Sequence, residues 1–112
     1  MSVTEEEIAH ALDLFAGTPG LRFRKQTGAA LIYADELLFA TVGDGEIYLK
    51  ARERFTRDMA AAGAVQFAIL RADGSRGTNC YWTLPAPARD DPDLARAWAE
   101  RAIAALRGDR TS

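Results

Sequence analysis

Hydrophobic residues recur at helical spacing near the start of the chain, where Ile8, Leu12 and Phe15 would share one face of a helix. Thr4 and Glu7 have the Thr-x-x-Glu spacing of a capping box, in which each side chain accepts a hydrogen bond from the other residue's backbone N–H. The pattern therefore predicts a helix over residues 4–16.

Two further segments have the helical pattern. One spans 52–62. The other begins at Pro92, with Asp91 as its N-cap, and is expected to end at Gly108. This ending predicts a frayed tail at 108–112.

Between the helices the pattern changes to the alternation of β-strands. The alternating segment 21–24 is short, so it is either a strand or only the approach to one. Tight turns join the predicted strands, which makes their pairing antiparallel. The order α-β-β-β-α-β-β-α predicts an α+β fold, in which an antiparallel sheet is packed with helices. The other five predicted strands are 29–34, 37–42, 46–50, 66–71 and 78–84.

The composition fits one globular domain, 1–112. Hydrophobic residues make up 48% of the chain, which is enough for a core at this length. Cys80 is the only cysteine, so no disulfide forms within the chain, and a reducing cytoplasm is the expected compartment. The N-terminus is acidic where a signal peptide would be basic and then apolar, and no apolar run approaches the ~18 residues of a membrane span.

The charges are nearly balanced, with 14 basic and 16 acidic residues. Within 21–76 the basic residues outnumber the acidic ones only by nine to seven. Proteins that bind nucleic acid usually carry a dense basic face. We therefore expect no direct binding of nucleic acid.

Residues for catalysis or metal binding are scarce. His10 is the only histidine, on the predicted polar side of the first helix, and Cys80 lies within a predicted packed strand. A nucleophilic Cys/His pair is therefore not expected, and a zinc site takes about four such ligands. Acidic clusters at 5–7 and 90–93 lie at helix starts, where capping and the helix dipole explain them. We expect no catalytic residue, no metal site and no cofactor.

A small basic group at Arg22, Arg24 and Lys25 is one candidate interaction site. Solvated ion pairs are the ordinary explanation for such a group. The functional explanation is a docking patch for an acidic partner or a phosphate backbone.

Two tyrosines form the second candidate site. Alternation places Tyr48 on the strand face of Lys50, opposite Ile47, and Tyr81 on the face opposite Trp82. If helices cover the apolar face, both tyrosines point to the other face, and a partner protein or a second copy of the chain would cover them. The alternative is that tyrosine is simply favourable in strands and that helices cover both faces.

Several segments carry a resemblance to a known family. The hairpin that ends in Tyr48-Leu49-Lys50, together with Tyr81-Trp82 before Pro85, resembles the N-terminal domain of the TfoX/Sxy family of bacterial competence proteins. The resemblance covers nearly the whole chain. Its matching segments are Arg24-Lys25, Leu31-Ile32-Tyr33-Ala34-Asp35, Leu38-Phe39-Ala40, Gly43-Asp44-Gly45-Glu46-Ile47-Tyr48-Leu49-Lys50, Gly63 with Phe67, Tyr81-Trp82-Thr83-Leu84-Pro85 and Trp98.

The chain departs from the family pattern in two places. Relatives often have Met-Phe-Gly-Gly after the Arg-Lys pair, where this chain has Gln26-Thr27-Gly28-Ala29. Relatives usually have glycine after the aspartate of the first hairpin, where this chain has Glu36. Glu36 would carry a conformational cost if the turn needed a positive φ there.

The resemblance implies a fold similar to that of type III secretion chaperones. It also implies a role in transcription and competence beside a regulator of the cyclic-AMP receptor protein type. Full-length members carry a second, helical C-terminal domain, and this sequence is expected to be a stand-alone N-terminal domain. We therefore expect a non-enzymatic protein-interaction domain. The alternative is a peptide-binding or chaperone-like module that associates with itself as a homodimer, and a small-ligand binder or enzyme is a further alternative.

Overall fold

A six-stranded antiparallel sheet with the order β1-β2-β3-β4-β6-β5 forms the framework of the molecule. The computed structural model describes residues 3–26, 28–43, 45–52, 54–70, 72–74 and 76–111, without the side chains of 68–70, 76–79 and 109–111. The strands are β1 (Leu21–Gln26), β2 (Ala29–Ala34), β3 (Leu37–Gly43), β4 (Glu46–Lys50), β5 (Gln66–Leu70) and β6 (Arg76–Thr83).

Three α-helices and one short 3₁₀ turn accompany the sheet. They are α1 (Glu5–Leu14), α2 (Arg54–Ala61), η1 (Ala86–Ala88) and α3 (Pro92–Thr111). The predicted capping box is confirmed: Thr4 Oγ1 accepts from the Glu7 N–H at 3.1 Å, and Glu7 Oε1 accepts from the Thr4 N–H at 3.2 Å. Asp91 caps α3 as predicted, because its Oδ1 accepts from the N–H of Asp93 at 3.0 Å and of Leu94 at 3.3 Å.

The α+β class, the antiparallel pairing and the order of the elements are confirmed. The segment 21–24, left open between a strand and an approach, is part of the full strand β1, which pairs with β2 along its whole length. β6 begins at Arg76, two residues earlier than predicted. Of the predicted turns and ends, Asp44, Arg71 and Ser75 lie outside the described residues.

One local expectation was wrong, and the condition attached to a second is not met. Helix α3 does not end at Gly108 but continues to Thr111, and Gly108 does not adopt the positive φ of a helix-ending glycine. In the turn between β2 and β3, Asp35 has the positive φ, +57°, and not Glu36. The expected cost therefore falls on Asp35, and aspartate tolerates this conformation better than most residues.

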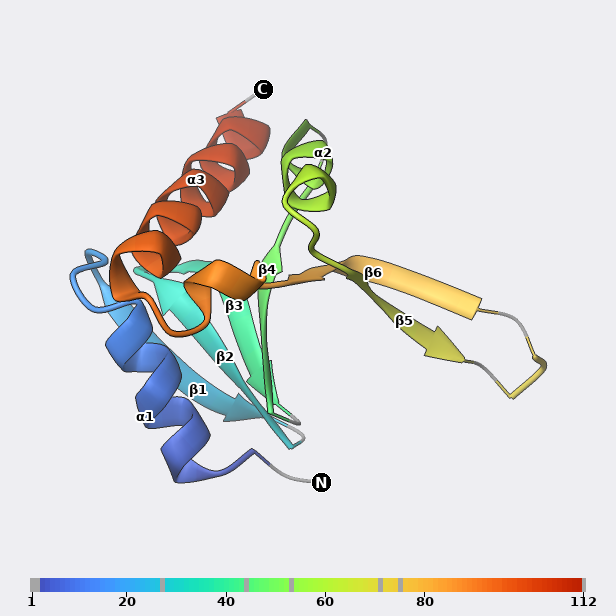
Figure 1. Cartoon of the computed structure of the whole chain (residues 1–112), viewed down its shortest axis with the longest axis horizontal. Helices are drawn as coiled ribbons and strands as arrows, with labels where there is room; N and C mark the ends of the chain where they lie inside the picture. Colours follow the sequence, from blue (N-terminus) through green and yellow to red (C-terminus); the bar gives the residue numbers. More distant parts are fainter. Residues whose placement is uncertain are drawn as a thin grey trace.

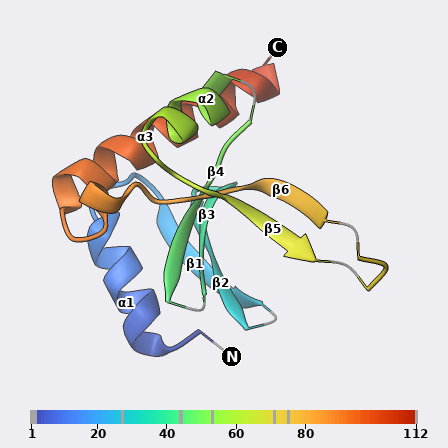
Figure 2. The same cartoon turned by 45° about the vertical axis from the view of Figure 1, so that its right-hand side comes forward.

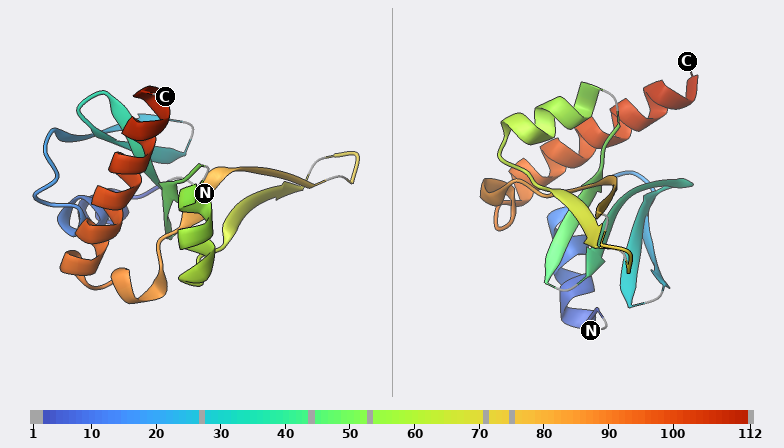
Figure 3. Two further views of the ribbon diagram at one scale, coloured as in Figure 1. Left: turned by 90° about the horizontal axis from the view of Figure 1, so that it is seen from above. Right: turned by 90° about the vertical axis from the view of Figure 1, so that its right-hand side faces the viewer.

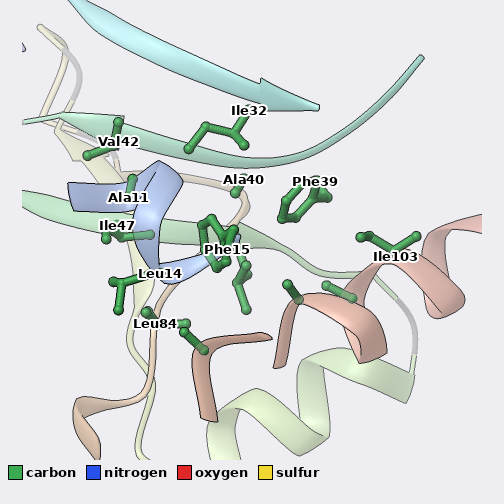
Figure 4. Packing of buried hydrophobic residues seen from close by; sticks show 14 of the residues in the cluster. Ala11, Leu14, Phe15, Ile32, Phe39, Ala40, Val42, Ile47, Leu84 and Ile103 are labelled. Carbon is green, nitrogen blue, oxygen red and sulfur yellow. The ribbon is translucent and has the colours of Figure 1, made fainter. Parts of the chain in front are cut away.

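The core lies between the sheet and the helices. Figures 1 and 2 show the helices gathered on one side of the sheet. Phe15, the C-cap of α1, meets Phe39 of β3 edge to face, with ring centroids 5.4 Å apart. Figure 4 shows these side chains with Ile32, Val42 and Ile103 filling the layer between sheet and helices. Trp82 and Trp98 are partly buried and pack against this cluster.

Candidate interaction surface

The strand register sorts the side chains into two faces. Directly opposed residues of antiparallel strands share a face. One row crosses the sheet through Ile32, Ala40 and Leu49, which are all fully buried beneath the helices. The neighbouring row must therefore lie on the opposite face.

That neighbouring row crosses five strands and defines what we call the open face. Arg24 is exposed, and the other members of the row are only partly buried. No helix of the described part of the chain lies over this face in any view (Figure 3). The row consists of Arg24, Leu31, Thr41, Tyr48 and Thr83, on β1, β2, β3, β4 and β6 in turn.

The two predicted tyrosines lie together on the open face. Tyr48 is paired with Thr83, and Lys50 is paired with Tyr81, so all three predicted residues of this site lie on the adjacent strands β4 and β6. Tyr48 and Tyr81 are half-buried. Burial raises the pKa of the Tyr81 phenol, and the nearby Cys80 and Tyr33 act in the same direction. Tyr81 is therefore a neutral hydrogen-bonding group at neutral pH.

Phe67 lies on the open face with Tyr48 and Tyr81, and we call these three residues the aromatic centre. Its ring meets that of Tyr48 at 5.4 Å between centroids and an interplanar angle of 88°. The Phe67 side chain is 37% exposed. Phe67 was not predicted from the sequence as a site residue, because the segment from Phe67 onward is apolar on both faces and shows no alternation.

The predicted basic group is divided between the two faces. Arg22 and Arg24 are paired with Tyr33 and Leu31, on the open face, and the Arg22 guanidinium lies 4.5 Å from the centre of the Tyr33 ring. Lys25 alternates to the other face, where its Nζ lies 4.0 Å from a carboxylate oxygen of Glu5 on α1. The open face thus has two arginines at β1 and Lys50 at β4, three strands away, or about 14 Å at the usual strand spacing.

A cleft of about 250 Å³ lies beside the β3–β4 hairpin, away from the aromatic centre. Lining residues of the cleft form a hydrogen bond and an ion pair with one another: the Gly45 N–H donates to Glu7 Oε2 at 2.8 Å, and Arg89 Nη2 lies 2.6 Å from Glu46 Oε1. His10 is exposed, as predicted, and its Nε2 is 3.3 Å from the Arg89 carbonyl oxygen. The two backbone N–H groups of Gly45 and Thr4 lower the pKa of the Glu7 carboxyl.

These contacts make the cleft a junction between α1, the β3–β4 hairpin and the segment that joins η1 to α3. The described lining residues include no serine, threonine or cysteine to act as a nucleophile. Across the described residues, no three His, Cys, Asp or Glu side chains cluster as metal ligands would. None of the described helices combines the length and the apolar character needed to cross a membrane.

The comparison with protein families agrees with this architecture. The model of the TfoX N-terminal domain matches residues 13–106, which include all six strands and both the aromatic centre and the two arginines of the open face. No curated protein matches the sequence. The chain therefore belongs to the TfoX N-terminal domain family.

Proposed function

We propose that this chain is a non-enzymatic protein-interaction domain and that the open face is its docking surface. The observation that carries the proposal is the row from Arg24 to Thr83, which crosses five strands without a covering helix in the described residues. Apolar and aromatic side chains that remain accessible on a sheet face are typical of binding surfaces.

The chemistry of the open face selects the kind of partner. Tyr48 and Phe67 offer rigid aromatic surface, which often dominates binding energy at protein interfaces. Arg22 and Arg24 on β1 and Lys50 on β4 add positive charge to the same face. The matching partner is a protein with an apolar patch bordered by acidic residues.

Family membership makes a transcription regulator of the cyclic-AMP receptor protein type the first partner to test. In this proposal the domain contributes to competence and transcription through protein contact, without binding DNA itself. The near balance of acidic and basic residues in the chain supports a protein partner over nucleic acid.

Direct binding between purified proteins tests the proposal. The regulator of this type from the native host would be labelled and titrated with the domain at physiological salt, where exposed charges are screened over ~8 Å. Tyr48→Ala and Phe67→Ala are expected to weaken binding about fivefold or more each, because truncation of a central aromatic residue commonly costs more than 1 kcal/mol.

Two neighbouring residues give a matched charge control. Arg24→Glu reverses a charge on the open face and should weaken binding, whereas Lys25→Glu makes the same change on the helix side and should leave binding unchanged. A regulator that does not bind, or that binds Arg24→Glu as tightly as the parent, would contradict the proposal. Selective capture of unfolded polypeptides would favour the chaperone-like alternative.

A further inference from the structure

The β5–β6 hairpin projects from the body of the molecule. In Figures 1 and 3 it extends well beyond the helices, along the longest dimension of the chain, 43 Å. β5 is the outer strand of this hairpin and one edge of the sheet, and it pairs with β6 on its inner side. An edge strand presents backbone N–H and C=O groups to any further strand that approaches it.

The two edges of the sheet differ in charge. At the opposite edge, β1 carries Arg22, Arg24 and Lys25 within six residues. Charged side chains on an edge strand are a common protection against pairing with another chain. β5 has the sequence Gln-Phe-Ala-Ile-Leu, with no charged residue and no proline. Only the β5 edge is therefore chemically suited to extend the sheet.

Apolar surface is also exposed where β5 begins. Val65, directly before the strand, is 65% exposed, and Phe67 is 37% exposed. An uncharged strand has no charge that would attract an oppositely charged partner, and two copies of it do not repel each other. The absence of charge along β5 thus favours an identical strand as the occupant.

We infer that two copies of this chain pair through β5, antiparallel and symmetric about Ala68, to form one continuous sheet. In this register Phe67 of one copy stands opposite position 69 of the other. Gln66 stands opposite Leu70 in the same way. The pairing is isologous and has two-fold symmetry.

The symmetry has two structural consequences. A two-fold axis that relates adjacent antiparallel strands is perpendicular to the sheet, so the open faces of both copies would lie on the same side. Each chain has one uncharged edge, and the charged β1 edge stops further addition of copies. The assembly is therefore a closed dimer and not a fibre. This inference does not depend on the proposed partner at the open face.

The oligomeric state of the full chain is the first test. Light scattering coupled to size-exclusion chromatography at about 100 µM protein should give twice the 12.2 kDa of one chain, and dilution should shift the mass toward the monomer. Ala68→Lys and Ala68→Glu each place like charges directly opposite one another and should weaken the dimer about tenfold or more. A mixture of the two variants should restore dimers, because opposite charges then meet.

A milder variant protects the test against a loss of folding. Ala68→Cys should form a disulfide between the two chains under mild oxidation, because opposed residues have Cα atoms about 4.5–5.5 Å apart, within the reach of a disulfide. Phe23→Cys, on the opposite edge, and the unmodified chain, which has only Cys80, are the controls and should not cross-link. A chain that is monomeric at this concentration, or a dimer that cross-links through Phe23→Cys instead, would overturn the inference.

Discussion

Gly20 lies so close to Asp35 that a Cβ atom at position 20 would fall 2.1 Å from Asp35 Oδ1 and 2.7 Å from the Asp35 backbone nitrogen. The Asp35 N–H donates to the Gly20 carbonyl oxygen at 2.9 Å, which holds the two backbones together. Both residues have a positive φ, +71° at Gly20 and +57° at Asp35. The contact joins the start of β1 to the turn between β2 and β3.

Gly20→Ala should therefore destabilise the fold by more than the cost of its backbone conformation. A positive φ costs an L-residue about 1–2 kcal/mol, and the displacement of Asp35 adds to this cost. The free energy of unfolding, measured by urea denaturation, should fall by about 2–4 kcal/mol.

Gly63→Ala is the matched control for this prediction. Gly63 has a φ of +86°, but no atom lies within 4 Å of the position that its Cβ would occupy. This variant should show only the backbone cost of about 1–2 kcal/mol. Equal losses in both variants would show that the contact with Asp35 has no energetic role.

Glu7 should make the stability of the chain depend on pH in the acidic range. The N–H groups of Gly45 and Thr4 lower the pKa of the Glu7 carboxyl below its ordinary value of 4.5. The folded state then binds the proton less readily than the unfolded state, so the contribution of Glu7 is present above pH 4.5 and is lost as the pH falls through its lowered pKa.

Glu7→Gln should flatten this part of the stability profile. The free energy of unfolding of the parent chain is expected to decline more steeply below pH 4.5 than that of the variant, as measured by urea denaturation at a series of pH values. Glu6→Gln makes the same change on an exposed neighbour in the same helical turn and should follow the parent. Parallel profiles for the parent and Glu7→Gln would contradict the prediction.

Local signals in the sequence were sufficient for most of the fold. The capping box of Thr4 and Glu7 and the N-cap of Asp91 depend on residues three or fewer positions apart, so the sequence alone contains them. The character of 21–24 could not be decided in this way, because β1 is exposed along most of its length and gains its regular structure from pairing with β2. Non-local pairing leaves little trace in the pattern of an edge strand.

The side chains that share the open face were predicted as far as strand alternation reaches. Alternation separates Tyr48 from the buried Ile47 and Leu49 of its strand. In the basic group the same alternation separates Lys25 from Arg24. The contact of Phe67 with Tyr48 connects β5 to β4, which are not neighbours in the sheet because β6 lies between them. This contact depends on the order of the strands in the sheet, which cannot be read from the sequence.

The continuation of α3 through Gly108 gives a stabilising substitution. Gly108 has no positive φ, and no atom lies within 4 Å of its Cβ position. Alanine is favoured over glycine within a helix by up to about 1 kcal/mol, so Gly108→Ala should raise the free energy of unfolding by about 0.5–1 kcal/mol.

Thermal and urea denaturation would measure this gain. Gly45→Ala is the control, because Gly45 has a φ of +76° in equally open space, and this variant should lower stability. If residues 108–111 were frayed, Gly108→Ala would be neutral, so a stability equal to that of the parent would contradict the helical end of α3.

Tyr81 should lower the stability of the fold at alkaline pH. Burial raises the pKa of its phenol above the ordinary value of 10.0. The folded state therefore holds the proton more tightly than the unfolded state, so the stability that Tyr81 contributes is present below pH 10.0 and is lost as the pH rises through the raised pKa. Tyr81→Phe removes the ionisable group and should make the free energy of unfolding fall less steeply above pH 10.0.

The absorbance of tyrosinate measures the ionisation of Tyr81 directly. When the titration curve of Tyr81→Phe is subtracted from that of the parent chain, the difference curve should have its midpoint above pH 10.0. A difference curve centred at or below that value would show that Tyr81 is open to solvent, and the half-buried aromatic centre of the open face would then be wrong at this position.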